Sequence, residues 1–209
     1  MLPPNDSLQA WTDALAAPTP TPAGGSAAAI AAALGASLVE MVATLTAGRQ
    51  SYADVHQEST AAVDRAGPLR RRLLELASED ATAFEAVVEA AALPRTTEAE
   101  IARRNAARWD ALKSAAAVQY EVLLLAGEVA DLAEGLTKHG LRSAVGDAAT
   151  AVFLAAAACR SAYWAIRSNL RRVYDDPEAQ RLRDAALERL EMVEATERRT
   201  AVVLSERME

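Results

Sequence analysis

The sequence predicts an all-α protein: a single-domain bundle of five to six helices that spans residues 1–209 and forms a homodimer. Strand signals are scarce, because no Asn-Gly or Asp-Gly hairpin turn and no alternating run of β-branched residues occurs. Hydrophobic residues make up 51% of the 209 residues and aromatic residues only 4%, so alanine, leucine and valine must form most of the core. These thin side chains favour closely packed helices, and apolar residues recur at helical spacing along the chain.

The N-terminal part is expected to hold two helices separated by a proline-rich loop. Asn5–Ala17 is predicted to form a short amphipathic helix, which the three prolines between residues 18 and 22 terminate. Ser26 stands in a good N-cap position for the next helix. We expect that helix to run to about Ala47 and to end at Gly48.

Longer helices are expected in the rest of the chain. One begins near residue 51, has a possible kink or restart at Gly67-Pro68, and ends before residue 94. Thr97 and Glu100 form a capping box that opens a helix to about residue 136. An apolar helix is expected over 144–170, and Asp176 before a proline opens the last helix, to about residue 205.

The charge pattern argues against a nucleic-acid partner. The formal net charge is −7, and no basic stripe interrupts the acidic background. The cluster Arg70–Arg72 lies among acidic residues, so we interpret it as a solvated helix face.

Three features favour a cytoplasmic protein without a membrane segment. The single cysteine, Cys159, excludes an intrachain disulfide and fits a reducing compartment. The N-terminus lacks the basic start and apolar run of a signal peptide. The apolar stretch Ala27–Val39 stops at Glu40, short of the ~20 apolar residues that a membrane-spanning helix needs.

The homodimer is predicted from two wholly apolar helices. The segments 26–47 and 144–170 need cover on all sides, and five or six helices offer limited cover. A second copy of the chain would bury the apolar surface of these two helices that the bundle leaves exposed. The alternative is a self-sufficient monomeric bundle.

The first candidate site is the loop at 20–26. Gly24 and Gly25 let the backbone approach a ligand closely. The helix that begins at Ser26 offers free amide hydrogens and the positive end of its dipole to an anion or a polar ring. No Gly-Lys-Ser/Thr follows, so this is not a P-loop. The alternative is a plain helix cap.

Two aspartates are candidates for acid–base chemistry. Asp80 shares a helical face with apolar residues, and a carboxylate there loses hydration. The alternative is that Asp80 lies at the edge of this face and reaches water. Asp147 is the only carboxylate between residues 134 and 175, so it caps the helix, pairs with a donor such as arginine, or faces a ligand. Arg49 and Asn169 are candidate ligand-binding residues, and Arg49 could instead cap a helix.

Several familiar chemistries have no signature in the chain. His56 and His139 are the only histidines, and no HExxH or Cys/His metal-binding spacing occurs. No Gly-x-Ser-x-Gly elbow of a hydrolase is present either. We therefore expect no metal.

Three segments carry a family resemblance. They are Pro-Thr-Pro-Ala-Gly-Gly-Ser at 20–26, Leu-Gly-Ala-Ser-Leu-Val-Glu-Met-Val-Ala-Thr-Leu-Thr-Ala-Gly-Arg at 34–49 and Leu-Leu-Glu-Leu-Ala-Ser-Glu-Asp-Ala-Thr-Ala-Phe at 73–84. With the Asp147-Ala148 and Asn169-Leu170 pairs, they resemble the cyclodeaminase domain of formimidoyltransferase-cyclodeaminase and the small stand-alone methenyltetrahydrofolate cyclohydrolases. The resemblance covers roughly residues 8–170 in order.

The resemblance implies an all-helical homodimer whose substrate is a tetrahydrofolate derivative and whose reaction needs no metal. A cyclodeaminase joins N10 to the formimino carbon and releases ammonia, giving 5,10-methenyltetrahydrofolate. A cyclohydrolase adds water to the methenyl carbon, giving 10-formyltetrahydrofolate. No formimidoyltransferase segment occurs in the chain, which slightly favours a stand-alone enzyme.

The resemblance also implies residue roles. Asp80 matches the family's acid before an aromatic residue and is the first candidate for the acid–base role, with Asp147 second. Gly24, Gly25 and Ser26 would line the folate site. The chain departs from the family pattern at four positions, namely Ala23 for glycine, Arg49 for lysine, Gly146 for serine and Gln119 for a frequent proline. The alternatives are a divergent non-catalytic helical dimer that binds folate or a protein partner, and a purely structural dimer.

Overall fold

A computed structural model describes residues 7–171 and 176–209, and within these ranges the chain forms helices and loops but no strand. The elements are α1 (Leu8–Ala16), α2 (Gly24–Ala47), η1 (Gln50–Val55), α3 (His56–Ala92), α4 (Glu98–His139), η2 (Arg142–Ala144), α5 (Val145–Asn169) and α6 (Pro177–Met208), where η1 and η2 are short 3-10 segments. The all-α prediction is confirmed. The assignment of 1–209 to one domain stays a prediction.

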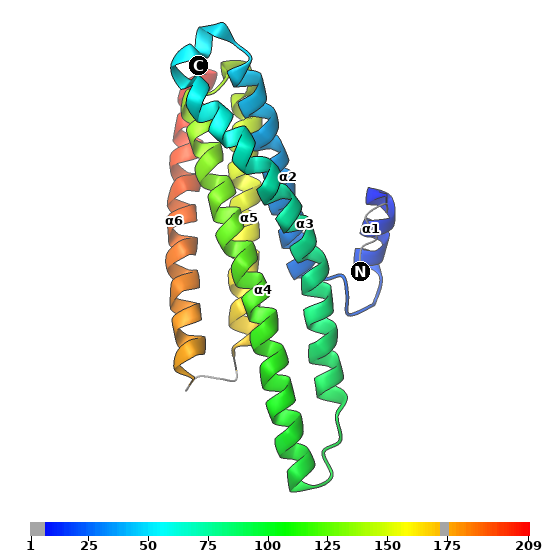
Figure 1. The fold of residues 1–209 in the computed structure, drawn as a ribbon. Helices are drawn as coiled ribbons and strands as arrows, with labels where there is room; N and C mark the ends of the chain where they lie inside the picture. The colour runs from blue at the N-terminus through cyan, green and yellow to red at the C-terminus, as the bar shows by residue number, and fades with distance from the viewer. Residues whose placement is uncertain (1–6, 172–175) are drawn as a thin grey trace.

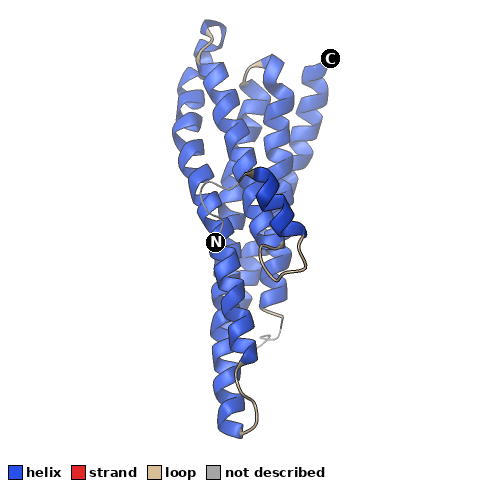
Figure 2. Ribbon diagram, turned by 90° about the vertical axis from the view of Figure 1, so that its right-hand side faces the viewer, coloured by secondary structure: helices blue, strands red, loops and turns tan. Residues whose placement is uncertain are grey.

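The four helices α2 to α5 pack side by side as a bundle, and α6 lies along α4 and α5 (Figure 1). The short helix α1 stands off to one side of the bundle in Figure 1. Helices α3 and α4 continue as a pair beyond the N-terminal end of α2, as both views show (Figures 1 and 2). The first turn of α2 therefore lies partway along α3 and α4 rather than at their ends.

The core consists mainly of alanine, valine and leucine, as the composition predicts. Its largest fully buried aliphatic side chains are Leu73, Leu76, Leu123, Ile166, Leu170, Val39, Val42, Val122, Val129, Val152 and Val193. Small residues bring backbones together: a Cβ at Gly35 of α2 would lie 3.1 Å from the carbonyl oxygen of Ala151 on α5. This contact places Gly35 of α2 level with Ala151 of α5.

Two of the predicted helix caps are confirmed and one is wrong. Thr97 and Glu100 form the capping box at the start of α4, and the side chain of Asp176 accepts backbone hydrogen bonds at the start of α6. Ser26 is not an N-cap, because α2 begins two residues earlier, after Ala23. The Ser26 hydroxyl instead donates to a carboxylate on another helix.

Two helix boundaries also differ from expectation. The predicted start at Asn5 lies outside the described residues; α1 begins at Leu8, with Ser7 as its N-cap. At Gly67-Pro68 the expected restart is wrong, because α3 includes Pro68 within one continuous element, and the alternative of a kink stays a prediction.

Two segments are long and apolar enough, by length and composition alone, to cross a membrane: α2 and residues 142–169. About half of each is buried inside the bundle. Core helices of a soluble bundle meet the same criteria, so this observation is weak support for a membrane location.

Candidate functional site

The carboxylate of Asp80, on α3, lies against the first turn of α2. Asp80 Oδ2 accepts a hydrogen bond from Ser26 Oγ at 2.9 Å, and Oδ1 accepts one from Gln119 Nε2 of α4 at 2.6 Å. Ser26 and Gln119 are 0% and 1% exposed, whereas Asp80 is half-buried. Three residues that are far apart in sequence, on three consecutive helices, thus meet at one carboxylate. The helical spacing correctly predicted that Asp80 turns toward the other helices, and because Asp80 is only half-buried it also lies at the edge of this face, as the alternative had it.

Gly25 is required by this close approach. A Cβ at Gly25 would lie 2.6 Å from Asp80 Oδ2 and nearer still to Asp80 Oδ1 and Gln119 Nε2. Any side chain at this position would therefore displace the carboxylate. A Cβ at Gly24 would meet nothing within 4 Å, so only the second glycine is needed for the contact.

The electrostatic surroundings of Asp80 suit a negative charge. Its partner Ser26 belongs to the first turn of α2, where unpaired amide hydrogens and the helix dipole create a positive potential. Within 7–171 and 176–209, Asp80 is bonded by Ser26 and Gln119 and forms no ion pair. Neutral donors orient a carboxylate without a permanent counter-charge, which leaves it able to stabilise a positive charge on a ligand.

The neighbouring arginine, Arg72, is occupied by glutamates. Its guanidinium donates to Glu121 at 2.7 Å, to Glu79 at 3.1 Å and to Glu75 at 3.2 Å. The bond with Arg72 lowers the pKa of Glu121, and the glutamates raise the pKa of Arg72. Arg70 pairs with Glu40. Within the solvated face predicted for Arg70–Arg72, Arg71 is exposed as expected, whereas Arg70 and Arg72 form half-buried ion pairs with neighbouring helices.

Two of the three alternatives for Asp147, a helix cap and a pair with an arginine, are absent from the described part of the chain. Asp147 is exposed in the first turn of α5, where the N-cap residue is Ala144. In the described part of the chain it neither caps the helix nor pairs with an arginine. A role in facing a ligand therefore stays a prediction.

Arg49 and Asp147 lie far from Asp80 within one copy of the chain. Gly35 is level with Ala151, and the ten residues from Gly25 to Gly35 span about 15 Å of helix. Asp147 lies a further turn away, and Arg49 follows the C-terminal end of α2. One copy does not unite these residues, because nearly all of α2 separates Arg49 from Asp80 and about half of α2 separates Asp147 from Asp80.

Asn169, the remaining candidate for ligand binding, is the half-buried last residue of α5. No described hydrogen bond joins it to Asp80, Ser26 or Gln119. Its predicted role in binding a ligand is untested.

Gln119 is the residue of this site for which the sequence suggested no function. The available signal was its helical spacing: Ala115, Ala116, Val122 and Leu123 surround it on the buried face of α4. An amide on such a face needs a hydrogen-bond partner, and this requirement could have pointed to Asp80.

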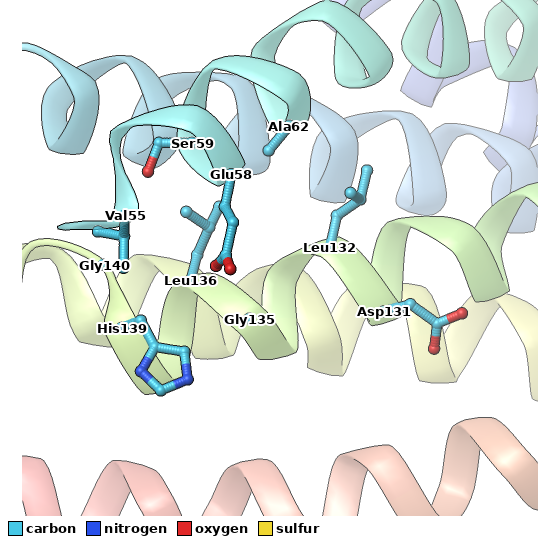
Figure 3. Close-up of a pocket in the computed structure, with 10 residues that line it drawn as sticks. All are labelled: Val55, Glu58, Ser59, Ala62, Asp131, Leu132, Gly135, Leu136, His139 and Gly140. Atoms are coloured by element: carbon cyan, nitrogen blue, oxygen red, sulfur yellow. The ribbon is translucent and has the colours of Figure 1, made fainter. Parts of the chain in front are cut away.

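Other hollows of the structure lie away from Asp80. One of about 190 Å³ lies between the start of α3 and the end of α4, with Glu58 and His139 on its walls (Figure 3). Another, of about 580 Å³, lies between α5 and α6 and is lined by Trp164 and Arg167 among others. Neither is lined by any of the residues that bond Asp80. In the described ranges, no three His, Cys, Asp or Glu side chains gather where they could hold a metal ion.

Comparisons with known proteins identify relatives over most of the chain. Residues 7–188 match the family model described as formiminotransferase-cyclodeaminase. The chain is 40% identical over 158 residues to the methenyltetrahydrofolate cyclohydrolase of Methylorubrum extorquens strain AM1, covering 76% of each protein. It is 30% identical over 170 residues to the formimidoyltransferase-cyclodeaminase of Rattus norvegicus, which is 81% of this chain but 31% of that protein.

A solved structure shares the fold. The crystal structure of formiminotetrahydrofolate cyclodeaminase from Thermotoga maritima superposes with a TM-score of 0.79 and 28% sequence identity. The match covers 97% of this chain and 96% of that one. The agreement therefore extends to the whole helical arrangement.

Proposed function

The chain belongs to the formiminotransferase-cyclodeaminase family, and on this premise we propose that it is an enzyme of folate one-carbon metabolism. The proposed substrate is a tetrahydrofolate derivative. The observation that carries the proposal is the Asp80 carboxylate, held by Ser26 and Gln119 over Gly25. One-carbon transfers at folate nitrogens need such a group, because they pass through a tetrahedral carbon whose nitrogens gain or lose positive charge.

The first candidate reaction is that of a methenyltetrahydrofolate cyclohydrolase. It is favoured by the 40% identity to a relative of that name over three-quarters of both chains. The second candidate is formimidoyltetrahydrofolate cyclodeaminase. It is favoured by the solved structure of that name, which matches nearly the full length of the chain.

In the cyclohydrolase reaction, Asp80 acts as a base and then as an acid. The carboxylate takes a proton from water as the water oxygen bonds to the cationic methenyl carbon. The protonated Asp80 then donates to N5 as the bond between N5 and this carbon breaks. Loss of the hydroxyl proton completes the formyl group on N10, so one water is consumed and one proton is released overall.

In the cyclodeaminase reaction, the same carboxylate assists ring closure. N10 attacks the protonated formimino carbon and loses its proton to Asp80, which gives a tetrahedral carbon bonded to three nitrogens. The proton passes to the amino group, and ammonia leaves as its bond to carbon breaks. The positive charge of the resulting methenyl product lies close to the carboxylate.

An absorbance assay of the methenyl compound tests the proposal and identifies the reaction. Loss of the methenyl absorbance on incubation with the protein supports the cyclohydrolase, and its appearance from formimidoyltetrahydrofolate supports the cyclodeaminase. Turnover of neither substrate, with tetrahydrofolate binding in a calorimeter, would support a non-catalytic folate-binding module. No binding at all would favour a structural dimer.

We further propose that two copies associate through the outer face of α2 and α5. On α2, Leu34, Leu38, Met41 and Leu45 follow a heptad-like spacing, and all but Leu38 are exposed. Phe153 and Trp164 extend the same kind of surface on α5. Because only about half of each apolar helix is buried in one copy, a second copy is the natural cover. Light scattering should give twice the mass of the chain.

A two-fold dimer of antiparallel α2 helices would bring opposite ends of α2 together. Arg49 of the partner subunit would then approach Asp80, and Asp147 of the partner subunit would lie between this point and the middle of α2, so that the proposed site residues of two copies line one elongated site. Asp80 would act on the reacting carbon. Asp147 and Arg49 would bind the folate beside Gly24, Gly25 and Ser26, and Asn169 would line the opposite side.

Mixed dimers test this shared site. Asp80→Asn and Asp147→Asn protein are each expected to be inactive. When the two are unfolded and refolded together, half of the dimers are mixed and each contains one intact site, so about a quarter of the wild-type activity should return. No recovery in mixed dimers of confirmed mass would contradict the shared site while leaving the role of Asp80 intact.

A further inference from the structure

We propose that Gln119 is a positioning residue: its amide fixes the orientation of the Asp80 carboxylate, and it does so at the expense of folding stability. The kinetic part of this inference rests on the proposed folate reaction. The structural part does not, because it concerns only how Asp80 is held.

The chemistry of the pair fixes which way the Gln119 amide points. A charged carboxylate can only accept hydrogen bonds, so the group that faces Asp80 Oδ1 must be the NH₂ of Gln119. The amide oxygen, Oε1, therefore points elsewhere. In the described part of the structure, Oε1 is buried and has no hydrogen-bond partner.

A buried acceptor without a partner lowers the stability of the folded protein. The neighbours of Gln119 on its face of α4 are alanine, valine and leucine, so an apolar side chain of the same length would suit the packing. The benefit of an amide at this position therefore lies in the one bond that it makes, to Asp80.

The bond matters because Asp80 is half-buried and has a route to solvent. Ser26 holds one carboxylate oxygen, Gln119 holds the other, and the backbone at Gly25 lies beneath both. Two donors on different helices fix the carboxylate plane. With one donor removed, the carboxylate can rotate about its single bonds, and misoriented acid–base groups lose much of their effect.

The variant Gln119→Met tests the inference, because methionine has a similar length and no amide. We expect kcat to fall by about 10–100-fold while KM stays within about threefold, since the change affects orientation rather than binding. The melting temperature should stay the same or rise by about 2–4 °C, since the unpaired acceptor is removed. The expected signature is lower turnover in a protein that is at least as stable.

Thr200→Val is the matched control. Thr200 of α6 is 0% exposed, and its Oγ1 is likewise buried without a described partner, but it has no bond to Asp80. We expect the same direction of change in melting temperature and unchanged kcat. If Gln119→Met fails to fold, Gln119→Leu takes its place with the same expectations.

Crystal structures of the wild-type and Gln119→Met proteins separate this inference from the proposed function. We expect Asp80 to leave its position over Gly25 in the variant. An unmoved Asp80, unchanged kcat, or a fall in kcat matched by a fall in melting temperature would overturn the inference. If wild-type protein converts neither folate substrate, the proposed function fails, and the position of Asp80 still decides the role of Gln119.

Discussion

Glu79 and Asp80 are consecutive residues of α3, yet their carboxylates have opposite surroundings. Glu79 turns toward Arg72, which also binds Glu75 and Glu121, and together they form an ion-pair cluster between α3 and α4. Asp80 turns toward the start of α2 and accepts hydrogen bonds from a hydroxyl and an amide. A rotation of about 100° around one helix separates the two positions.

The difference teaches how one helix can carry both a structural and a reactive acid. A guanidinium neutralises a carboxylate and favours its charged form, as the lowered pKa of Glu121 beside Arg72 illustrates. Neutral hydrogen-bond donors, such as Ser26 and Gln119, fix the orientation of a carboxylate and supply no positive charge beside it. Glu79 is therefore suited to orient Arg72, which joins α3 to Glu121 of α4, and Asp80 to meet a cationic ligand.

The sharpest test of this contrast is to neutralise each acid in turn. Asp80→Asn should lower kcat by about 10²–10⁴-fold, because the proton acceptor is lost. Glu79→Gln removes the adjacent charge and should change kcat by less than about threefold, because Glu79 bonds Arg72 and has no bond to Asp80 or its donors. Steady-state assays of the two variants check this. Equal effects would erase the distinction between the two residues.

Adding a methyl group at Gly25 should have the next largest effect. Gly25→Ala places a Cβ where Asp80 and Gln119 now lie, so we expect a loss of about 10–100-fold in kcat, with a lower melting temperature. Gly24→Ala is the control, since a Cβ there meets nothing within 4 Å. Wild-type turnover by Gly25→Ala would show that the close approach is dispensable.

Removing the hydroxyl donor should have a smaller effect. Ser26→Ala leaves Gln119 as the remaining donor, so we expect kcat to fall by about 3–10-fold. Ser37→Ala is the matched control on the same helix, because Ser37 Oγ donates to the carbonyl of Ala33. Steady-state kinetics of both variants measure the two values of kcat. A larger loss of kcat in Ser37→Ala than in Ser26→Ala would contradict the role of Ser26 as a donor to Asp80.

The smallest effect is expected for the ion-pair cluster, and it concerns stability alone. Arg72→Met should lower the free energy of unfolding by about 1 kcal/mol at pH 7. The effect is small because Arg72 and Glu121 are each more than one-third exposed to solvent. Turnover should be unchanged.

The pH dependence of this effect follows from the lowered pKa of Glu121. The stabilisation is fully present above pH 4.5, which is the ordinary pKa of a glutamate. It is lost as the pH falls through the lower pKa that Glu121 has in the folded protein. Urea unfolding of wild-type and Arg72→Met protein should therefore converge below about pH 4.5. A difference that persisted or grew in acid would contradict the assignment.

The sequence predicted those features of the fold that depend on neighbouring residues. The Thr97–Glu100 capping box and the Asp176 cap are local hydrogen-bond patterns, and both are present. The position of Asp80 toward the interior followed from helical spacing. Ser26 was misassigned because its hydroxyl has two possible uses, and the choice between its own helix and α3 depends on tertiary contacts.

The rest of the site depends on how the helices are placed in space. Gln119 meets Asp80 only because α4 returns alongside α3, and no spacing within either segment encodes that meeting. Arg49 and Asp147 share a family pattern with Asp80, but Arg49 follows the far end of α2 and Asp147 lies level with its far half, a separation that linear sequence does not reveal. A pattern of residues identifies candidates; the register between helices decides which of them meet.

The scarcity of aromatic residues has a practical consequence for spectroscopy. The three tryptophans belong to three different regions: Trp11 is buried on α1, Trp109 is half-buried on α4, and Trp164 is 58% exposed on α5. Indole emission shifts to shorter wavelength when water is excluded from the ring. Single-tryptophan versions of the chain would therefore report separately on the packing of α1, on the part of α4 that extends beyond α2, and on the outer apolar face. Dilution should redden only the emission of Trp164 if that face is where two copies meet.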